Sequence, residues 1–487
     1  MNIRRTSILV VLVLGIVVSA VVSQQSQATT SAQFAVAPKV SRPYASHRTP
    51  ITTTWYCPGV PAGDDSVGGE VVVANPTDVA LVGTITLLAT GGVAPISQSI
   101  TVPARGTLEF DVDQAMTAAF VSAYVELVGG EGMVEQKALF PAGDAVASCT
   151  TQTSDTWYFA DGFTVGNSVE QLIITNPSAD TANVDLTIVT DNGQRQPSAF
   201  QGKPVAPRSV LVISVAENGL VDEPIIAVKV TTSTGRLIVA RAQHYVGGGR
   251  LGYSLNLGAP SLQDQAWFAN GVKGEGVTEQ YVIYNPTDQD LSVEIYMLGF
   301  GAVPEFVDPQ PVDVAAGKVF MFDTASVVGL PDGPHSTVFS TLGEPAIVVE
   351  RVLTEPAGEQ VATTVVLGMT AEYVVTRWYV PIGVDEPTER ALVIQNIDFN
   401  DATVTIKSVG PGGAVAVPGL EALSLPASGI IDVPLTDPSV FGRQLIIEST
   451  QRVFVERVLP RGHEQIGRSG SWAIPECGPC NFLLPQP

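Results

Sequence analysis

The residues best suited to chemistry are four cysteines, two of which form the motif Cys477-Gly-Pro-Cys480. In thioredoxin-type redox enzymes this motif stands at the N-terminus of a helix, which acidifies the first thiol. Only seven residues, two of them prolines, follow Cys480. We therefore expect a small structural disulfide here and no redox catalysis.

Other catalytic or metal-binding patterns are missing from the sequence. The four histidines (His47, His244, His335 and His463) are dispersed, without a His or Cys partner at metal-ligand spacing. No Gly-x-Ser-x-Gly elbow, Walker loop or Rossmann glycine pattern occurs. The sequence therefore predicts a protein that is not an enzyme, with no catalytic residue, no cofactor and no metal site.

The first 50 residues read as an export segment and a linker. Arg4 and Arg5 precede an unbroken apolar run from Ile8 to Val22, which is typical of a signal peptide and equally of an uncleaved signal anchor. Residues 1–23 are assigned to this segment, with cleavage and a single N-terminal membrane anchor left as alternatives. Residues 24–50, rich in Gln, Ser, Thr, Ala and Pro, are expected to be a flexible tether. Everything after them is expected to lie outside the cytoplasm, secreted or anchored.

Charge and composition narrow the class further. The chain has 25 Lys and Arg against 48 Asp and Glu, and its first 50 residues contain no acid. The rest is therefore strongly acidic, and such a surface repels phosphate backbones, so nucleic-acid binding is excluded. Only 15% of residues are charged, and 46 glycines and 35 prolines are present. This mixture favours short strands joined by turns over long helices.

Five tryptophans mark an internal repeat. Trp55, Trp157, Trp267, Trp378 and Trp472 follow one another at spacings of 102, 110, 111 and 94 residues. After each of the first four, an apolar strand runs into an Asn turn, and a second turn containing Pro or Gly comes about 30 residues later. Each repeat ends on a strand with a similar core, namely Glu135-Gln136, Ala240-Arg241, Glu350-Arg351 and Glu456-Arg457. A period near 100 residues with about seven short strands indicates four immunoglobulin-like β-sandwiches in a row.

The expected boundaries follow from the tryptophans. They give repeat 1 at 51–156, repeat 2 at 157–266, repeat 3 at 267–377, and repeat 4 at 378–487 with a Cys-x-x-Cys cap. The chain is thus predicted to be all-β. The tryptophan openings, the Asn-Pro turns and the Val-Glu-Arg strands resemble an uncharacterised actinobacterial family of exported, N-terminally anchored envelope proteins. That resemblance implies location and architecture, and it implies no catalytic residue, cofactor or substrate.

Two structural roles are predicted for the marked residues. In an exported protein all four cysteines should be oxidised, and of the three possible pairings we favour Cys57 with Cys149, which flank repeat 1, and Cys477 with Cys480. The five tryptophans are expected at junctions between repeats, with a sugar-stacking surface as the alternative. Each Glu-Arg pair is expected to be a structural ion pair or to place an Arg at an interface.

The leading functional hypothesis is a non-enzymatic envelope protein that acts as a structural spacer or adhesion-type scaffold. The alternative is a binding module for cell-wall polysaccharide or for an envelope enzyme partner. A spacer would have uniform repeats, whereas a binding module would concentrate the differences between its repeats in one groove. The sequence does not indicate an oligomeric state.

Overall fold

The computed structural model describes residue 45 and residues 52–63, 67–129, 132–298, 307–462 and 465–476. The signal or anchor segment at 1–23, nearly all of the tether at 24–50, and Cys477 with Cys480 lie outside the described residues. Residues 40–487 form one compact unit. The statements below concern the described part of that unit.

The described chain is all-β, and its strands fall into four consecutive modules: module 1 (52–150), module 2 (154–259), module 3 (263–369) and module 4 (375–476). Module 1 contains β1 (Thr52–Ala62), β2 (Gly68–Ala74), β3 (Leu81–Ala89), β4 (Ile96–Val102), β5 (Thr107–Asp111), α2 (Val112–Ala115), β6 (Ala118–Val128), β7 (Met133–Leu139) and β8 (Ala145–Ser148). Module 2 contains β9 (Thr156–Phe159), η1 (Val165–Asn167), β10 (Val169–Asn176), β11 (Ala182–Thr190), β12 (Gly193–Arg195), η2 (Ser198–Phe200), β13 (Lys203–Val205), β14 (Ser209–Ser214), η3 (Ala216–Asn218), β15 (Ala227–Thr234), β16 (Ile238–Gly247) and β17 (Arg250–Leu257).

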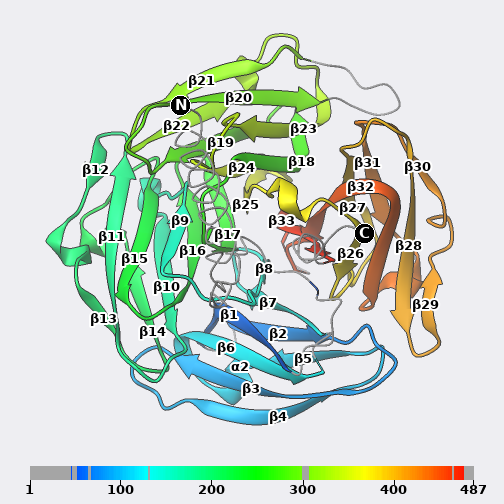
Figure 1. Ribbon diagram of the computed structural model, residues 1–487, viewed down its shortest axis with the longest axis horizontal. Helices are drawn as coiled ribbons and strands as arrows, with labels where there is room; N and C mark the ends of the chain where they lie inside the picture. Colours follow the sequence, from blue (N-terminus) through cyan, green and yellow to red (C-terminus); the bar gives the residue numbers. More distant parts are fainter. Residues whose placement is uncertain are drawn as a thin grey trace, which may run out of the picture. The chain divides into compact units, whose positions relative to one another are not determined.

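The second half of the chain repeats this order (Figure 1). Module 3 contains β18 (Gln265–Lys273), β19 (Thr278–Asn285), β20 (Leu291–Leu298), β21 (Gln310–Val314), β22 (Lys318–Asp323), η4 (Thr324–Ser326), β23 (Gly333–Ser340), β24 (Val348–Ala357) and β25 (Gln360–Leu367). Module 4 contains η5 (Ala371–Tyr373), β26 (Val375–Val380), β27 (Thr388–Asn396), β28 (Ala402–Gly410), β29 (Gly413–Ala416), β30 (Leu423–Leu425), β31 (Ile430–Leu435), η6 (Pro438–Val440), β32 (Gln444–Pro460), β33 (Arg468–Trp472) and β34 (Ile474–Pro475).

Each of the first three modules is built from two antiparallel sheets with the same strand order. In module 1 these are β1-β6-β3-β4 and β5-β2-β7-β8, in module 2 β9-β15-β11-β12 and β14-β10-β16-β17, and in module 3 β18-β23-β20-β21 and β22-β19-β24-β25. In module 4 the 17-residue strand β32 pairs with β26 and β28 through its first half and with β27 and β33 through its second half. In module 4, β32 therefore takes the place of two separate strands of the other modules and joins the two sheets into one.

Alternating side chains explain why these segments form strands. Along β11, Val184, Leu186 and Ile188 are fully buried while Asp185 and Thr187 are partly exposed. Residues with a period of two line one face of a strand, so the apolar set faces the opposite sheet. In module 2 that core combines residues from both sheets, including Trp157 and Phe159 of β9 with Leu172 and Ile174 of β10.

A buried asparagine joins two turns in every module. Asn285 is fully buried, its Nδ2 donates to Gln289 O at 2.7 Å and to Ala315 O at 3.2 Å, and its Oδ1 accepts from the backbone N of Thr287 at 3.0 Å. Equivalent bonds are made by Asn75, Asn176 and Asn396. The side chain therefore closes its own Asx turn and also holds the turn about 30 residues later. Asn396 does this although Ile397 replaces the proline.

Register decides where each tryptophan points. Trp55, Trp157 and Trp378 are buried. The tyrosine after each of them forms a backbone β-bridge with the segment that follows the closing strand of the same module. In module 3 the tryptophan stands one position later in the strand, at the place of these tyrosines, and Trp267 itself makes this bridge, to Met369. A shift of one residue reverses the face of a strand. Trp267 therefore points out of its module and lies 5.3 Å from the ring of Phe454 in module 4.

Trp472 does not lie in the opening strand of a module, as the other four tryptophans do, contrary to the sequence pattern. It ends β33, which pairs with the Glu456–Pro460 part of β32, and only the following residues, Ile474 and Pro475, pair with β26. It corresponds to Leu257 and Leu367 at the ends of β17 and β25. The tryptophan segment therefore opens each module, and Trp472 belongs to the closing strand of module 4.

The four modules close into a circuit instead of forming the open row expected from the sequence. The last long strands of the modules contact one another in the order β8, β17, β25, β33 and back to β8. Arg461 of module 4 donates a hydrogen bond to Ala142 O of module 1. The same side chain lies against Gly252 of module 2, where a Cβ atom would come within 1.9 Å of Arg461 Nη2. Every module therefore has two neighbours, and modules 1 and 4 are not exposed ends.

No helix in the described residues has the length and apolar character needed to cross a membrane. The sole α-helix among them, α2, has four residues.

Asn285→Asp should destabilise the protein by about 2 kcal/mol or more, because a carboxylate would replace an amide donor that faces two buried carbonyls. Urea unfolding of the full chain measures the change. Asn183→Asp on the exposed side of β11 is the matched control and should have little effect. Equal stability of the two variants would contradict the role of Asn285 in joining the two turns.

Candidate functional site

The Glu-Arg strands meet across the module junctions. Arg241 of module 2 forms a two-bond ion pair with Glu350 of module 3, with N–O distances of 2.9 and 3.0 Å. Arg351 of module 3 pairs in the same way with Glu456 of module 4. At most 1% of any of these side chains is exposed. Burial alone lowers the pKa of Arg241, but the Glu350 carboxylate and the neighbouring Asp161, Tyr245 and Glu170 together outweigh burial, and the pKa is raised.

The tryptophan turn supplies the remaining donors for the buried carboxylate. Glu350 Oε2 accepts hydrogen bonds from the backbone N–H groups of Ala160, at 2.8 Å, and Asp161, at 2.7 Å. Glu456 Oε2 accepts one from Asn270 at 3.0 Å. A buried carboxylate needs several donors to offset its lost hydration. The Ala-Asp/Asn-Gly turn of one module thus binds the glutamate of the next module. The contact connects two sequence motifs, the turn after the tryptophan strand and the Glu-Arg strand.

The third pair joins the last module to the first. Arg457 of module 4 donates to Glu135 Oε2 of module 1 at 2.8 Å, and both side chains are 1% exposed. Gln444 of module 4 adds bonds to the carbonyl oxygens of Asn75 and Gly106. This junction closes the circuit through non-covalent contacts among the described residues.

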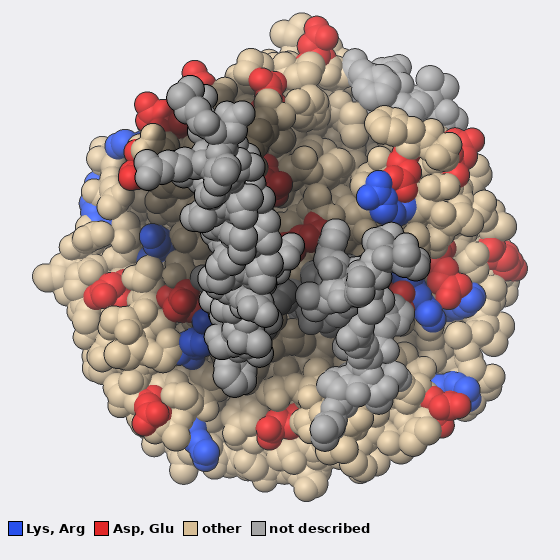
Figure 2. Space-filling view, viewed as in Figure 1, with Lys and Arg blue, Asp and Glu red and all other residues tan. Residues whose placement is uncertain are grey.

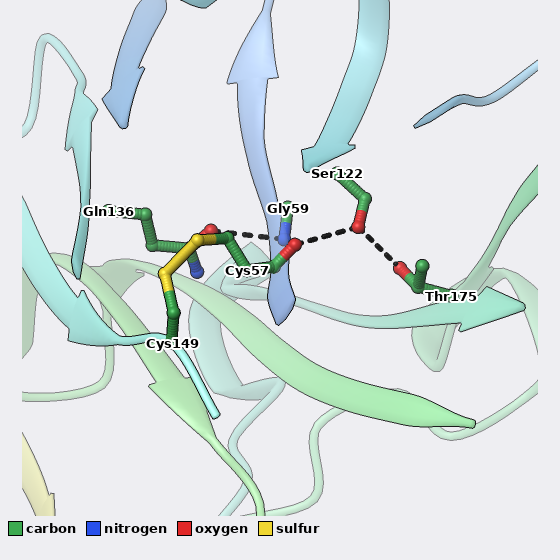
Figure 3. The surroundings of a disulfide bond; sticks show 6 residues. All are labelled: Cys57, Gly59, Ser122, Gln136, Cys149 and Thr175. Atoms are coloured by element: carbon green, nitrogen blue, oxygen red, sulfur yellow. Dashed lines mark hydrogen bonds between the residues drawn. A yellow bond between two sulfur atoms is a disulfide. The ribbon is translucent and has the colours of Figure 1, made fainter. Parts of the chain in front are cut away.

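The junction between modules 1 and 2 has neither member of the pair. Gln136 stands at the arginine position and Ala240 at the glutamate position, so neither charge is left alone. The Gly59 N–H, which belongs to the turn of module 1, donates to Gln136 Oε1 at 3.1 Å instead (Figure 3). The Ser122 hydroxyl lies 2.9 Å from that of Thr175 in module 2.

The disulfide among the described residues lies near the junction between modules 1 and 2. Cys57 of β1 is bonded to Cys149, the residue after β8, across 92 positions of sequence (Figure 3). Both cysteines are buried in the core shared by module 1 and part of module 2. The pairing of Cys477 with Cys480 lies outside the described residues.

The tryptophans take two kinds of position. Trp55, Trp157 and Trp378 lie in apolar cores, and Trp157 and Trp378 donate to carbonyls of their own modules. Trp267 and Trp472 lie at the junction of modules 3 and 4, where Trp472 Nε1 donates to Leu367 O at 2.9 Å. Phe454 belongs to module 4, so a protein that consists of modules 2 and 3 alone would lack the aromatic partner of Trp267.

The outward residues beside the tryptophans escaped the sequence analysis. Tyr56 packs against the core of module 2, Tyr158 against the cluster at the 2–3 junction, and Tyr379 contributes to the core that modules 4 and 1 share. They occupy the position of Trp267, one residue past the buried tryptophan. The alternation of a strand assigns this face to the neighbouring module, a signal present in the sequence.

A cleft remains at the junction of modules 4 and 1. Its cavity volume is about 270 Å³. Module 1 contributes the outer face of β2, β5, β7 and β8, and module 4 contributes residues 382–386, which follow the tryptophan turn, and the end of β32. Within the described residues no group of three or more His, Cys, Asp or Glu side chains is placed to hold a metal ion.

At one cross-strand position of this cleft, a charged pair replaces the uncharged residues of the other modules. Glu70 lies opposite Lys137, with a 4.0 Å ion-pair distance. The corresponding pairs are Gln171–Ala242 and Gln280–Val352, and module 4 has Ala391 and Val458 next to its pair of Leu392 with Arg457. Burial raises the pKa of Glu70; Lys137 opposes this shift, and neighbouring carboxylates add to it. This charged pair is therefore one of the differences between the modules.

The equivalent space at the 2–3 junction is filled. Phe163, the residue after the glycine of that turn, packs there with Val282, Val352 and Tyr245. Module 4 has the smaller Val384 at this position. Modules 1 and 3 also have valine here, as Val60 and Val272. The ring is therefore particular to module 2, and at the 4–1 junction the smaller side chain borders the cleft.

One buried acid has no partner in the described residues. Glu170 of β10 is fully buried and neither of its carboxylate oxygens accepts a hydrogen bond there. Its counterpart in module 3, Glu279, lies 2.8 Å from His335 Nε2, but module 2 has Ile226 at that place. Burial raises the pKa of Glu170 to about 8, against the opposing effect of Arg241.

Variants of Glu135 and Arg457 test whether each buried charge needs the other as its counterion. Arg457→Gln alone should cost about 3 to 5 kcal/mol, because it leaves Glu135 buried without its counterion. Adding Glu135→Ala recreates the natural 1–2 combination and should recover most of this loss. Urea unfolding of the full chain measures both. Additive losses in the double variant would contradict the coupling.

Glu170→Gln should make stability less dependent on pH. The folded pKa of about 8 exceeds the unfolded value of 4.5, so the stability that protonated Glu170 contributes is full below pH 4.5 and is lost as pH rises to 8. The variant should therefore gain about 3 to 5 kcal/mol relative to the natural protein between these pH values. Melting curves at both pH values, with exposed Glu217→Gln as control, check this. A constant difference would refute the assignment.

Comparisons with known proteins place the chain in a family. Among solved structures, a Thermotoga maritima protein described as "Crystal Structure of Thermotoga maritima 1070" is similar at 16% identity, with a TM-score of 0.20, over 22% of this chain and 94% of its own. No curated protein matches. The model described as "Family of unknown function (DUF5719)" matches residues 141–249 and 258–439, more than half of the chain. The chain therefore belongs to the family of unknown function DUF5719.

Proposed function

We propose that this protein is a non-enzymatic, extracytoplasmic envelope protein whose closed circuit of modules is a rigid scaffold with one binding groove. The predicted export segment at 1–23 supports a location outside the cytoplasm, secreted or held by a single N-terminal anchor. The disulfide between Cys57 and Cys149 fits an oxidising compartment. The actinobacterial origin suggested by sequence resemblance belongs to the same proposal.

The observation that carries the binding role is the charged cleft at the 4–1 junction. Apolar clusters pack the junctions, and the 4–1 junction keeps in addition a cleft lined by charges. A uniform spacer has no need of such a difference. Ligand sites are typically concave, with a few polar groups set in apolar walls. Binding of a cell-wall polysaccharide or an envelope protein partner is therefore favoured over a purely structural spacer.

The scaffold role rests on the fold. We interpret the modules as four immunoglobulin-like sandwiches, since each combines two antiparallel sheets around an apolar core. Three buried ion pairs fix their mutual orientation. Such a body holds a ligand surface in one geometry, which suits adhesion better than a flexible tandem array does.

Acidic and basic side chains are interspersed on the face shown in Figure 2, without a continuous basic patch among the described residues. Together with the excess of 48 acidic over 25 basic side chains, this favours partners other than nucleic acid.

Val384→Phe tests the binding role, because it introduces the kind of aromatic side chain that fills the 2–3 junction. The purified full chain would be applied to a glycan array and used to capture proteins from an envelope extract. We expect selective binding that Val384→Phe abolishes, while Val415→Phe, at a position 64% exposed on β29, leaves it unchanged. Absence of selective binding, or equal binding by the two variants, would contradict the groove.

A further inference from the structure

We infer that β4, the outer edge strand of module 1, is a self-association surface. Two copies of this chain pair their β4 strands antiparallel about a two-fold axis, with Ser99, the middle residue of β4, nearest to the axis. Strand β4 contributes no residue to the 4–1 cleft, so this role does not depend on the binding proposed there.

Strand β4 is a regular sheet edge without a partner on its outer side. It ends the sheet β1-β6-β3-β4 and lies at the margin of module 1 (Figure 1). Its seven residues pair with β3 in one continuous register. Four of them are exposed, namely Ser97, Gln98, Ser99 and Thr101. An edge of this kind presents a row of backbone donors and acceptors with which a further strand can pair.

The corresponding edges of the other modules have features that prevent strand pairing. In module 2 the edge is divided into β12 and β13, which carry Arg195 and Lys203. In module 3 the edge strand β21 contains Pro311 and Asp313. In module 4 the edge is divided into β29 and β30, of four and three residues. Charges, prolines and short strands all block edge-to-edge association. Strand β4 has none of these features.

The chain around β4 lacks acidic side chains. Residues 79–108 contain no Asp or Glu, and Arg105 is the one charged residue among them. The equivalent segments, 180–209, 289–318 and 400–429, contain three, five and two acidic residues. The whole chain has a net charge of −23, so two copies repel each other in most orientations. At β4 they can approach without placing carboxylates opposite each other.

A second copy of this chain suits the edge because the edge is self-complementary. Rotation about a two-fold axis places the donors of an antiparallel edge opposite acceptors of the same edge. The same rotation would bring Lys203 or Asp313 of the other edges toward its own copy, and like charges opposite each other are unfavourable. The exposed side chains of β4 are hydroxyls and one amide, which can hydrogen-bond to their own kind.

Exposed valines beside β4 add apolar area to this surface. Val82 of β3 is 50% exposed and lies opposite Thr101 of β4, and Val93 in the turn before β4 is 44% exposed. A second copy that pairs with β4 can cover them. The surface is nevertheless small, so we expect a reversible dimer with a Kd in roughly the micromolar range.

Sedimentation equilibrium of the purified full chain over a range of concentrations tests the inference. We expect a monomer–dimer equilibrium whose Kd rises at least about tenfold in Ser99→Lys, because two lysines then meet near the axis. The charge-matched control Ser424→Lys, at an exposed position of β30, should leave the Kd unchanged. A chain that stays monomeric up to about millimolar concentration, or a dimer that both variants affect equally, would overturn the inference.

A second pair of variants tests the geometry without adding charge. Under mild oxidation, Ser99→Cys should form a disulfide-linked dimer, because the two side chains lie close together at the axis. Ser424→Cys should remain unlinked under the same conditions. Non-reducing electrophoresis measures both. Equal linkage of the two variants, or no linkage of Ser99→Cys at concentrations where the natural chain is dimeric, would contradict pairing through β4.

Discussion

The buried carboxylate at three of the four module junctions is the constraint on which the arrangement of modules depends. A glutamate moved out of water needs a counterion and several hydrogen-bond donors. Here the previous module supplies both, an arginine from one strand and N–H groups from the turn after its tryptophan strand. These three elements must meet at fixed distances, so the pair sets how one module lies on the next. The buried pair is better understood as a determinant of geometry than as a source of stability.

The matched replacement at the 1–2 junction follows from the same constraint. An arginine or a glutamate left alone in that interior would be an uncompensated charge, so both are absent together, as Gln136 and Ala240. The turn of module 1 then bonds to its own Gln136. Apolar packing and the hydroxyl contact between Ser122 and Thr175 hold the modules there. The four junctions are thus similar in backbone and different in chemistry.

This difference creates room for function in an otherwise repetitive protein. The 4–1 junction keeps the ion pair but lacks the aromatic side chain that Phe163 contributes at the 2–3 junction. Charged residues on β2 and β7 face the resulting cleft. Closing the circuit also places residues far apart in sequence, such as Glu70 and Glu386, around one space.

The sequence by itself determined the features that depend on neighbouring residues. Alternation along Val184 to Ile188 specifies a half-buried strand, and the four asparagine turns at constant offsets specify a repeat near 100 residues, because period and turn chemistry are local. Only the tertiary structure decided which glutamate meets which arginine, since partners such as Glu135 and Arg457 are 322 positions apart. It also decided that Trp267 points outward and that the row closes on itself. Trp267 stands one position later in its strand than the other opening tryptophans, which places it on the opposite face, and closure of the row depends on contacts between modules that no local pattern specifies.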